Sequence, residues 1–405
     1  MTCLRLLAML LAALMVAPAP APAQSPPLAI TVEGAEFEPL PIAIAAFAAV
    51  EGVEPARAAE IEGVIRADLV GSGLFRVIDP AAYPAETPDF DRVPQFAPWD
   101  VINAAALVTG RVSPAEDGRL AVQFRLFDVA AQVQLEGTQL VGFADEWRRI
   151  AHKAADAIYT RLTGEGPYFD SRIVFIDETG PKGSRVKQLA VMDQDGANFR
   201  VIPGTAGITL TPRFSPNHST ALYVSYDTGQ PQIFLIDIDT GQRRRVGNLP
   251  GMSFAPRFMP SGEALLFSKT DGANTDIYAM DLSGARLRRL TTSPAIDTAP
   301  SPSPDGSRIV FESDRGGRQQ LYVMPASGGP AQRISFGQGR YGTPVWSPRG
   351  DRIAFTKMLG GRFHTGVMRT DGTEQALLSA RFLEEGPTWS PNGRVIMFTR
   401  ETRGE

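Results

Sequence analysis

A repeat in the second half of the chain limits the fold more than any other feature of the sequence. Its marker is a short Pro-x-aromatic-Ser-Pro-like segment, and successive markers lie 44, 44, 44 and 43 residues apart, at Pro212, Pro256, Pro300, Pro344 and Pro387. Each marker is followed by a predicted strand with an aromatic residue at one fixed place: Tyr223, Phe267, Phe311, Phe355 and Phe398. A further copy of this strand, with Phe175, precedes the first marker. Four short strands in every repeat predict one β-propeller blade per repeat.

Six copies of the aromatic strand predict six blades. A blade buries its two faces only against its neighbours, so the array is expected to close into a ring. A Ser-Pro-x-Gly corner turns the innermost strand into the second; His218 takes the glycine position in one blade, and we expect it to be a turn residue. The last repeat stops after the strand 395–400, which predicts either a truncated chain or an open sixth blade.

The first half of the chain mixes helical and strand periods. Over 55–69 apolar residues recur on one helical face, and Gly71-Ser72-Gly73 ends the helix. A second helix is expected after Asp145, whose side chain can cap it, and it ends near Leu162. Strands are expected at 30–32, 42–47, 75–78, 106–112, 120–127 and 133–141. We therefore predict an α/β N-terminal domain over 24–163, a linker over 164–170 and the propeller over 171–405.

Residues 1–23 have the pattern of a secretory signal peptide. Arg5 precedes an unbroken apolar run of 11 residues, 6–16, which is too short to span about 30 Å of hydrocarbon. An Ala21-Pro22-Ala23 segment follows, and we expect cleavage after Ala23. The alternative is an uncleaved N-terminal anchor. The single cysteine, Cys3, lies in this segment, so the exported chain would have no disulfide.

Composition and motifs argue against several classes of function. A net charge of −4 gives no basic surface for nucleic acid. The three histidines lie far apart in sequence, and Asp193-x-Asp195-Gly196 is better explained as a hairpin turn than as a calcium loop, so we expect no metal and no cofactor. His152 is expected on the exposed side of its helix. No nucleophile motif is present, and we expect no catalytic residue and no enzyme.

The best candidate for a binding site is the mouth of the propeller. We define the mouth as the five segments that lead into innermost strands: 207–211, 250–255, 295–299, 339–343 and 383–386. Methionine, aromatic residues and arginine are enriched at protein interfaces. We expect the mouth to expose Met252, Phe254, Arg340, Tyr341, Glu384 and Glu385.

The order of these features resembles the TolB family, periplasmic components of the Tol–Pal system of Gram-negative bacteria. The resemblance covers the signal peptide, the segments ITVEG and PIAIAAF, the helix ending ADLVGSGLFRVID, the linker and the Ser-Pro-x-Gly blades. It implies a monomeric, non-enzymatic protein of the periplasm that does not insert into the membrane and acts in outer-membrane integrity and cell division.

The resemblance also implies two protein partners. The lipoprotein Pal would bind at the mouth, where Met252, Ala255 and Thr298 match the contacting positions, although the family commonly has histidine in place of Met252. TolA would bind the mature N-terminal segment, 27–38, whose apolar–acidic pattern suits a strand-forming peptide. The residues expected to contact TolA are Leu28, Ile30, Val32 and Glu33.

Two other classes of protein carry similar propellers. One is the prolyl-oligopeptidase-like serine peptidase, whose propeller covers a hydrolase domain; this chain has no nucleophile elbow and its N-terminal half is too short for that domain. The other is a propeller enzyme that binds a sugar or lactone with a metal in its channel. The innermost strands here carry mostly Pro, Ser and aromatic residues instead of the converging carboxylates or histidines that such a site needs.

Overall fold

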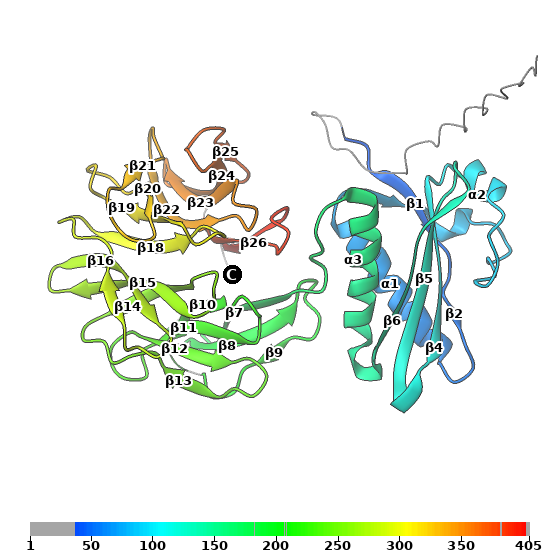
Figure 1. Ribbon diagram of the computed structural model, residues 1–405, viewed down its shortest axis with the longest axis horizontal. Helices are drawn as coiled ribbons and strands as arrows, with labels where there is room; N and C mark the ends of the chain where they lie inside the picture. Colours follow the sequence, from blue (N-terminus) through cyan, green and yellow to red (C-terminus); the bar gives the residue numbers. More distant parts are fainter. Residues whose placement is uncertain (1–36, 182, 206, 208, 381–382, 402–405) are drawn as a thin grey trace, which may run out of the picture.

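The computed structural model describes residues 37–181, 183–205, 207, 209–380 and 383–401. Two parts lie side by side, an α/β domain and a β-propeller, and the chain passes from one to the other directly after helix α3 (Figure 1). In the described residues no helix is long and apolar enough to cross a membrane. The expected strand 30–32 lies outside the described residues.

The N-terminal domain is built on one mixed sheet with the strand order β3-β1-β4-β5-β6, in which β2 also pairs with β4. The strands are β1 (Leu40–Ile44), β2 (Ala48–Ala49), β3 (Phe75–Val77), β4 (Ala106–Pro114), β5 (Arg119–Asp128) and β6 (Val133–Phe143). Strands β1, β3 and β4 run parallel, whereas β4, β5 and β6 form an antiparallel meander. Asp117 and Gly118, which lie between β4 and β5, both have positive φ, 59° and 71°, as a tight hairpin turn requires.

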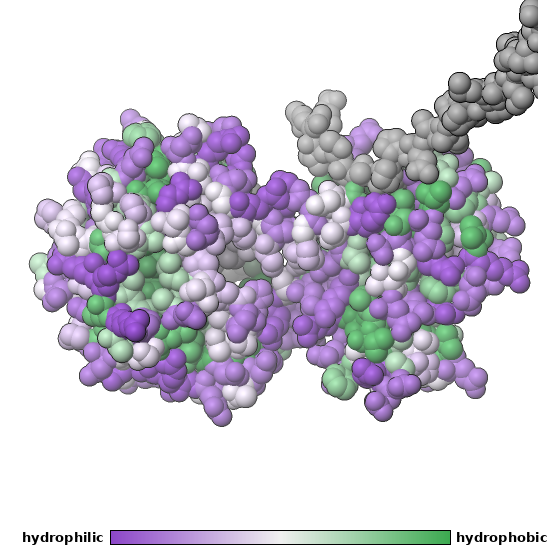
Figure 2. Space-filling model, in the orientation of Figure 1, coloured by the Kyte–Doolittle hydropathy of each residue, from purple (hydrophilic) through white to green (hydrophobic). Residues whose placement is uncertain are grey.

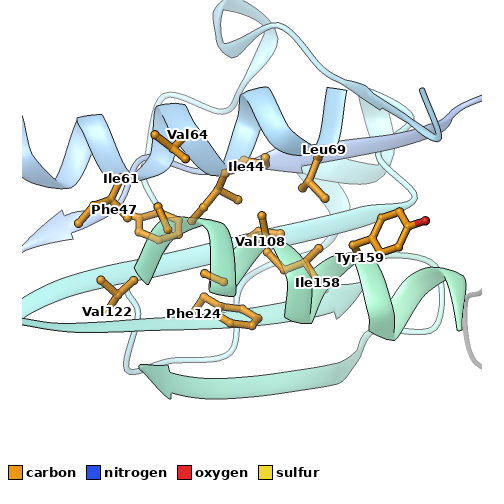
Figure 3. Packing of buried hydrophobic residues seen from close by; sticks show 14 of the residues in the cluster. Ile44, Phe47, Ile61, Val64, Leu69, Val108, Val122, Phe124, Ile158 and Tyr159 are labelled. Atoms are coloured by element: carbon orange, nitrogen blue, oxygen red, sulfur yellow. The ribbon is translucent and has the colours of Figure 1, made fainter. Parts of the chain in front are cut away.

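Helices cover both faces of this sheet. Helix α1 (Pro55–Gly71) and helix α3 (Trp147–Thr163) pack on one face, where their apolar side chains meet those of the strands in a single core (Figure 3). The short helix α2 (Ala97–Val101) and its flanking loop place Phe96 and Trp99 on the other face. Because neighbouring strand residues point to opposite faces, Ile42 joins the first core and Ala43 the second.

The ends of helix α3 differ in part from the prediction. Asp145 does not cap the helix, because a 3-10 turn, η3 (Ala144–Glu146), precedes it and Glu146 occupies the cap position without a side-chain hydrogen bond. At the C-terminal end Gly164 adopts the left-handed conformation, with φ of 71°, and stops the helix.

The propeller consists of a series of small antiparallel sheets. Four of them have four strands each, and they are preceded by a three-stranded sheet, β7-β8-β9, and followed by a two-stranded sheet, β26-β27. The innermost strands that open the sheets after the first are β10 (Thr209–Phe214), β14 (Ser253–Phe258), β18 (Asp297–Pro302), β22 (Arg340–Trp346) and β26 (Leu383–Trp389). A β-propeller with an N-terminal α/β domain is therefore confirmed, and the count of six blades stays a prediction.

The remaining strands complete the sheets in chain order. The second strands are β7 (Arg172–Thr179), β11 (Thr220–Ser225), β15 (Ala264–Asp271), β19 (Arg308–Ser313), β23 (Arg352–Leu359) and β27 (Ile396–Glu401). The third strands are β8 (Val186–Asp193), β12 (Gln232–Asp237), β16 (Asn274–Asp281), β20 (Gln320–Pro325) and β24 (Arg362–Arg369). The outermost strands are β9 (Arg200–Val201), β13 (Arg243–Arg245), β17 (Leu287–Arg289), β21 (Gln332–Arg333) and β25 (Ala376–Leu377).

The repeated aromatic residues hold neighbouring sheets together. Tyr223, Phe267, Phe311 and Phe355 have no exposed surface, and their clusters join residues of adjacent sheets. Each of the first three lies opposite an aromatic residue of the next strand, as Phe267 lies opposite Tyr278. In the fourth case the partner is Gly366, and Tyr341 packs on the ring of Phe355 at 5.3 Å between centroids. The sequence repeat thus reflects packing between blades.

Candidate functional site

Each innermost strand carries a bulge just inside the mouth. The pairing of β10, β14, β18, β22 and β26 with its neighbour shifts register by one residue immediately before or at the repeat proline. The residue before that proline has positive φ in every case: Thr211, Ala255, Ala299, Thr343 and Gly386. Four of the five are not glycine, a conformation that costs about 1–2 kcal/mol for each residue. The bulges therefore bend each strand, while the residues before the bulge still pair with the second strand in a shifted register.

Some amides at these bulges bond to the preceding blade. The amide of Ala299 donates to Ser268 Oγ at 3.1 Å, and the amide of Thr343 donates to Glu312 Oε2 at 2.9 Å. The other carboxylate oxygen of Glu312 accepts from the hydroxyl of Thr298 at 2.5 Å. One half-buried carboxylate therefore links the starts of β18 and β22 and restrains the backbone at this point.

Six of the eight residues expected at the mouth keep some exposed surface there. Met252, Arg340 and Glu385 are exposed, and Phe254, Ala255 and Thr298 are half-buried. The expected exposure of Tyr341 and Glu384 is wrong, because both side chains are fully buried. Tyr341 donates its hydroxyl to Phe336 O or Gln375 Oε1, at 3.0 and 2.9 Å, and Glu384 pairs with Arg400 at 2.9 Å. Both side chains therefore lie in the interior of the propeller, where they hold together the strands that carry the mouth.

The structure adds apolar side chains that the sequence analysis missed. An apolar rim of six exposed residues comes from successive blades, at the end where the innermost strands begin: Tyr226, Met252, Ile296, Phe336, Met358 and Leu378. Only Met252 was expected. Methionine and aromatic side chains exposed at one end of a domain are typical of a protein-binding surface. In the sequence these residues could have been found as apolar residues at or directly beside the ends of the predicted strands.

The expected TolA-binding residues Leu28, Ile30, Val32 and Glu33 lie outside the described residues. The structure therefore places none of them.

The linker is bound to corners of the propeller at the opposite end from the mouth. Glu165 pairs with Arg349 at 2.5 Å and with Arg394, and these residues lie in the corners that follow β22 and β26. The ion pairs with Arg394 and Arg349 hold the pKa of Glu165 below its ordinary value, against a smaller opposing effect of burial. Asn392 also donates to Gly166 O at 3.0 Å. Figure 2 shows mainly hydrophilic residues where the two parts meet.

A second contact between the two parts involves a buried histidine. His152 is 2% exposed, so its expected exposure is wrong. It lies on α3, the helix nearest the propeller (Figure 1), and its Nδ1 lies 2.6 Å from Asp68 Oδ2 at the end of α1. Burial alone would lower the pKa of His152, but the hydrogen bond to Asp68 and the nearby negative charges outweigh it and raise the pKa. The contact therefore favours positive charge at the imidazole.

Two family models match the chain. A model described as "TolB amino-terminal domain" matches residues 28–135, and one described as "TolB beta propeller domain" matches residues 159–405. The order of the two matches agrees with the order of the two parts in the structure.

Curated relatives and a solved structure agree with these matches. The "Tol-Pal system protein TolB" of Jannaschia sp. (strain CCS1) is 56% identical over 227 residues, which is 56% of this chain and 51% of that protein. The protein of the same name from Dinoroseobacter shibae is 56% identical over 228 residues, with the same coverage. The chain therefore spans about half the length of the curated relatives it matches. The crystal structure of TolB from Acinetobacter baumannii has a TM-score of 0.78 at 28% identity, and covers 89% of this chain and 87% of that one.

Proposed function

The chain belongs to the TolB family, and we propose from this that it is a protein-binding scaffold of a Tol–Pal cell-envelope system. The relatives that it matches carry the Tol–Pal name, and neither matching model describes a catalytic domain. In this proposal the protein is a monomer of the periplasm, released after Ala23, and it serves outer-membrane integrity and constriction during division.

The observation that carries the proposal is the apolar rim at the mouth. The rim places exposed side chains such as Met252 and Phe336 around the starts of the innermost strands. The hydrogen bonds of Glu312 to Thr298 and Thr343 fix the backbone beneath it. A rigid surface loses little conformational entropy on binding, which favours a folded protein partner.

We assign the mouth to Pal and the N-terminal segment to TolA. The Pal-binding surface would consist of Met252, Phe254, Ala255, Thr298, Arg340 and Glu385, with Tyr341 and Glu384 as its buried support. The TolA-binding residues would be Leu28, Ile30, Val32 and Glu33, which can add as a strand to the edge of a partner sheet.

The Pal assignment is tested by Met252→Arg. A charged residue in place of a packed apolar contact costs about 2 kcal/mol or more, which corresponds to roughly thirtyfold weaker binding of soluble Pal by calorimetry. Leu287→Arg is the matched control, because Leu287 is 43% exposed, against 42% for Met252, but lies on the outermost strand β17. Equal affinity of the two variants would remove Met252 from the interface.

The TolA assignment is tested by deleting residues 24–33 from the mature protein. The deletion is expected to abolish TolA binding while Pal binding stays within about twofold, since the mouth is built from other residues. Native affinity of the shortened protein for TolA would show that the epitope lies elsewhere.

A further inference from the structure

The contact around His152 contains an unused ligand atom. Asp68 accepts from His152 Nδ1 at 2.6 Å, and its other oxygen accepts from Gln194 Nε2 at 3.0 Å. Asp68 therefore fixes a proton on Nδ1, and once the proton on Nε2 is displaced, that nitrogen presents a lone pair. Nε2 is buried and has no hydrogen-bond partner among the described residues. A buried nitrogen of this kind requires a ligand or a proton.

The Nε2 atom faces carboxylates of the propeller. Asp195 Oδ2 lies 3.7 Å from it, across the junction between the two parts. His152, Asp193 and Asp195 bring one ligand atom each to within 4.8 Å of one another. Opposite two carboxylates, Nε2 requires a positive charge, which either its own proton or a metal cation between them supplies.

We propose that His152, Asp193 and Asp195 form a binding site for one zinc ion between the N-terminal domain and the propeller. An imidazole whose second nitrogen donates to a carboxylate is the usual arrangement of a metal-binding histidine. Zinc bonds of about 2.0–2.2 Å place two ligand atoms at most about 4 Å apart, so the 3.7 Å between His152 and Asp195 is suitable. Asp193 is half-buried and its Oδ2 accepts from Asn198 Nδ2 at 2.7 Å, so Oδ1 is the oxygen left for the ion.

The charge at the junction also suits a divalent cation. Asp68, Asp193 and Asp195 carry three negative charges, and Arg148, which pairs with Asp195, carries one positive charge. With a neutral histidine the balance is −2. One nitrogen with carboxylate oxygens suits zinc better than calcium or magnesium, which take oxygen ligands almost alone. Because Asp195 also pairs with Arg148, it would bind the ion more weakly. His152 and Asp193 would then contribute most of the affinity for zinc.

The test is zinc binding by the full mature chain after removal of metals with a chelator. Calorimetry is expected to give one zinc ion per chain, and His152→Gln and Asp193→Asn are each expected to weaken binding at least tenfold. His364→Gln is the matched control, because His364 lies in β24 and belongs to no such group of described residues. Asp193 is half-buried, so its variant keeps the test valid if His152→Gln does not fold.

A second measurement separates zinc from the alternatives. Imidazole nitrogen resonances of the three histidines should show zinc shifting Nε2 of His152 alone while Nδ1 keeps its proton. The proposal is overturned by the absence of stoichiometric zinc binding, by equal binding in wild type and both variants, by loss of binding in His364→Gln, or by binding of calcium in preference to zinc. None of these outcomes bears on Pal or TolA binding, which use other residues.

Discussion

Asp156 is expected to be the most sensitive polar residue at the entry to the propeller. It lies on α3, is 7% exposed, and its carboxylate accepts three backbone N–H groups from the end of the linker. Oδ1 accepts from Tyr168 at 2.7 Å and from Phe169 at 2.8 Å, and Oδ2 accepts from Asp170 at 3.0 Å. Replacing Asp156 with alanine leaves all three donors without this acceptor.

The cost follows from the burial of the donors. Tyr168 and Phe169 are 7% and 1% exposed, and a buried donor left without a partner costs about 1–3 kcal/mol. Two such donors give about 3 kcal/mol for Asp156→Ala. Asp156→Asn keeps one oxygen for Tyr168 and Phe169 but turns an NH2 group towards the amide of Asp170, so about 1 kcal/mol is lost.

Hydrogen exchange of the linker amides measures this difference directly. At about 1.4 kcal/mol for each factor of ten, the Phe169 amide should exchange about a hundredfold faster in Asp156→Ala and about fivefold faster in Asp156→Asn. Asp371→Ala is the control, because Asp371 caps an exposed turn through Thr373 and should leave Phe169 unchanged. The reasoning is refuted if the alanine and asparagine variants exchange equally fast, since the structure assigns them different numbers of lost bonds.

Two further predictions concern the junction and the blades. Because the pKa of Glu165 is lowered in the folded protein, the stabilisation by Glu165 is complete above the ordinary pKa of 4.5 and is lost as the pH falls through the folded-state pKa. The urea midpoint of Glu165→Gln should therefore vary less with pH in that range than the midpoint of the wild type. Parallel pH profiles for variant and wild type would contradict this. Gly372 and Gly196 occupy equivalent turns with φ of 89° and 88°, but a Cβ at Gly372 would collide with the carbonyl oxygen of Ile334, whereas a Cβ at Gly196 meets nothing within 4 Å. Gly372→Ala should therefore cost about 1–3 kcal/mol more than Gly196→Ala in thermal unfolding, and equal costs would argue against the close approach.

The repeated half of the chain could be predicted because its contacts are local. The strand with Phe267 pairs with strands adjacent in sequence, and Phe267 packs on the preceding repeat. The same packing requirement therefore recurs every 44 residues or so. The exposure of Tyr341 and Glu384 was predicted wrongly because β22 and β26 begin at Arg340 and Leu383. Both residues are therefore ladder residues with buried side chains, although the sequence analysis assigned them to the loops of the mouth.

The junction could not be predicted, because its residues are distant in sequence. His152 and Asp68 are 84 residues apart, and Asp195 lies on another domain. The spacing of apolar residues in α3 predicts only the face that packs on the sheet of its own domain, which includes Ile150 and Ile158. The face of α3 that packs on the propeller does so through polar groups, so it adds no hydrophobic periodicity to the sequence. His152 therefore has the sequence pattern of an exposed residue.

The bonds from Ala299 to Ser268 and from Thr343 to Glu312 mean that the blades are not interchangeable modules. Each bond joins a main-chain amide of one blade to a side chain of the blade before it. A blade transplanted whole into a neighbouring position would bring its own strands but would lose the side chain that its amide requires. Evolution of the array by duplication would then require paired changes, one on each side of these two blade boundaries.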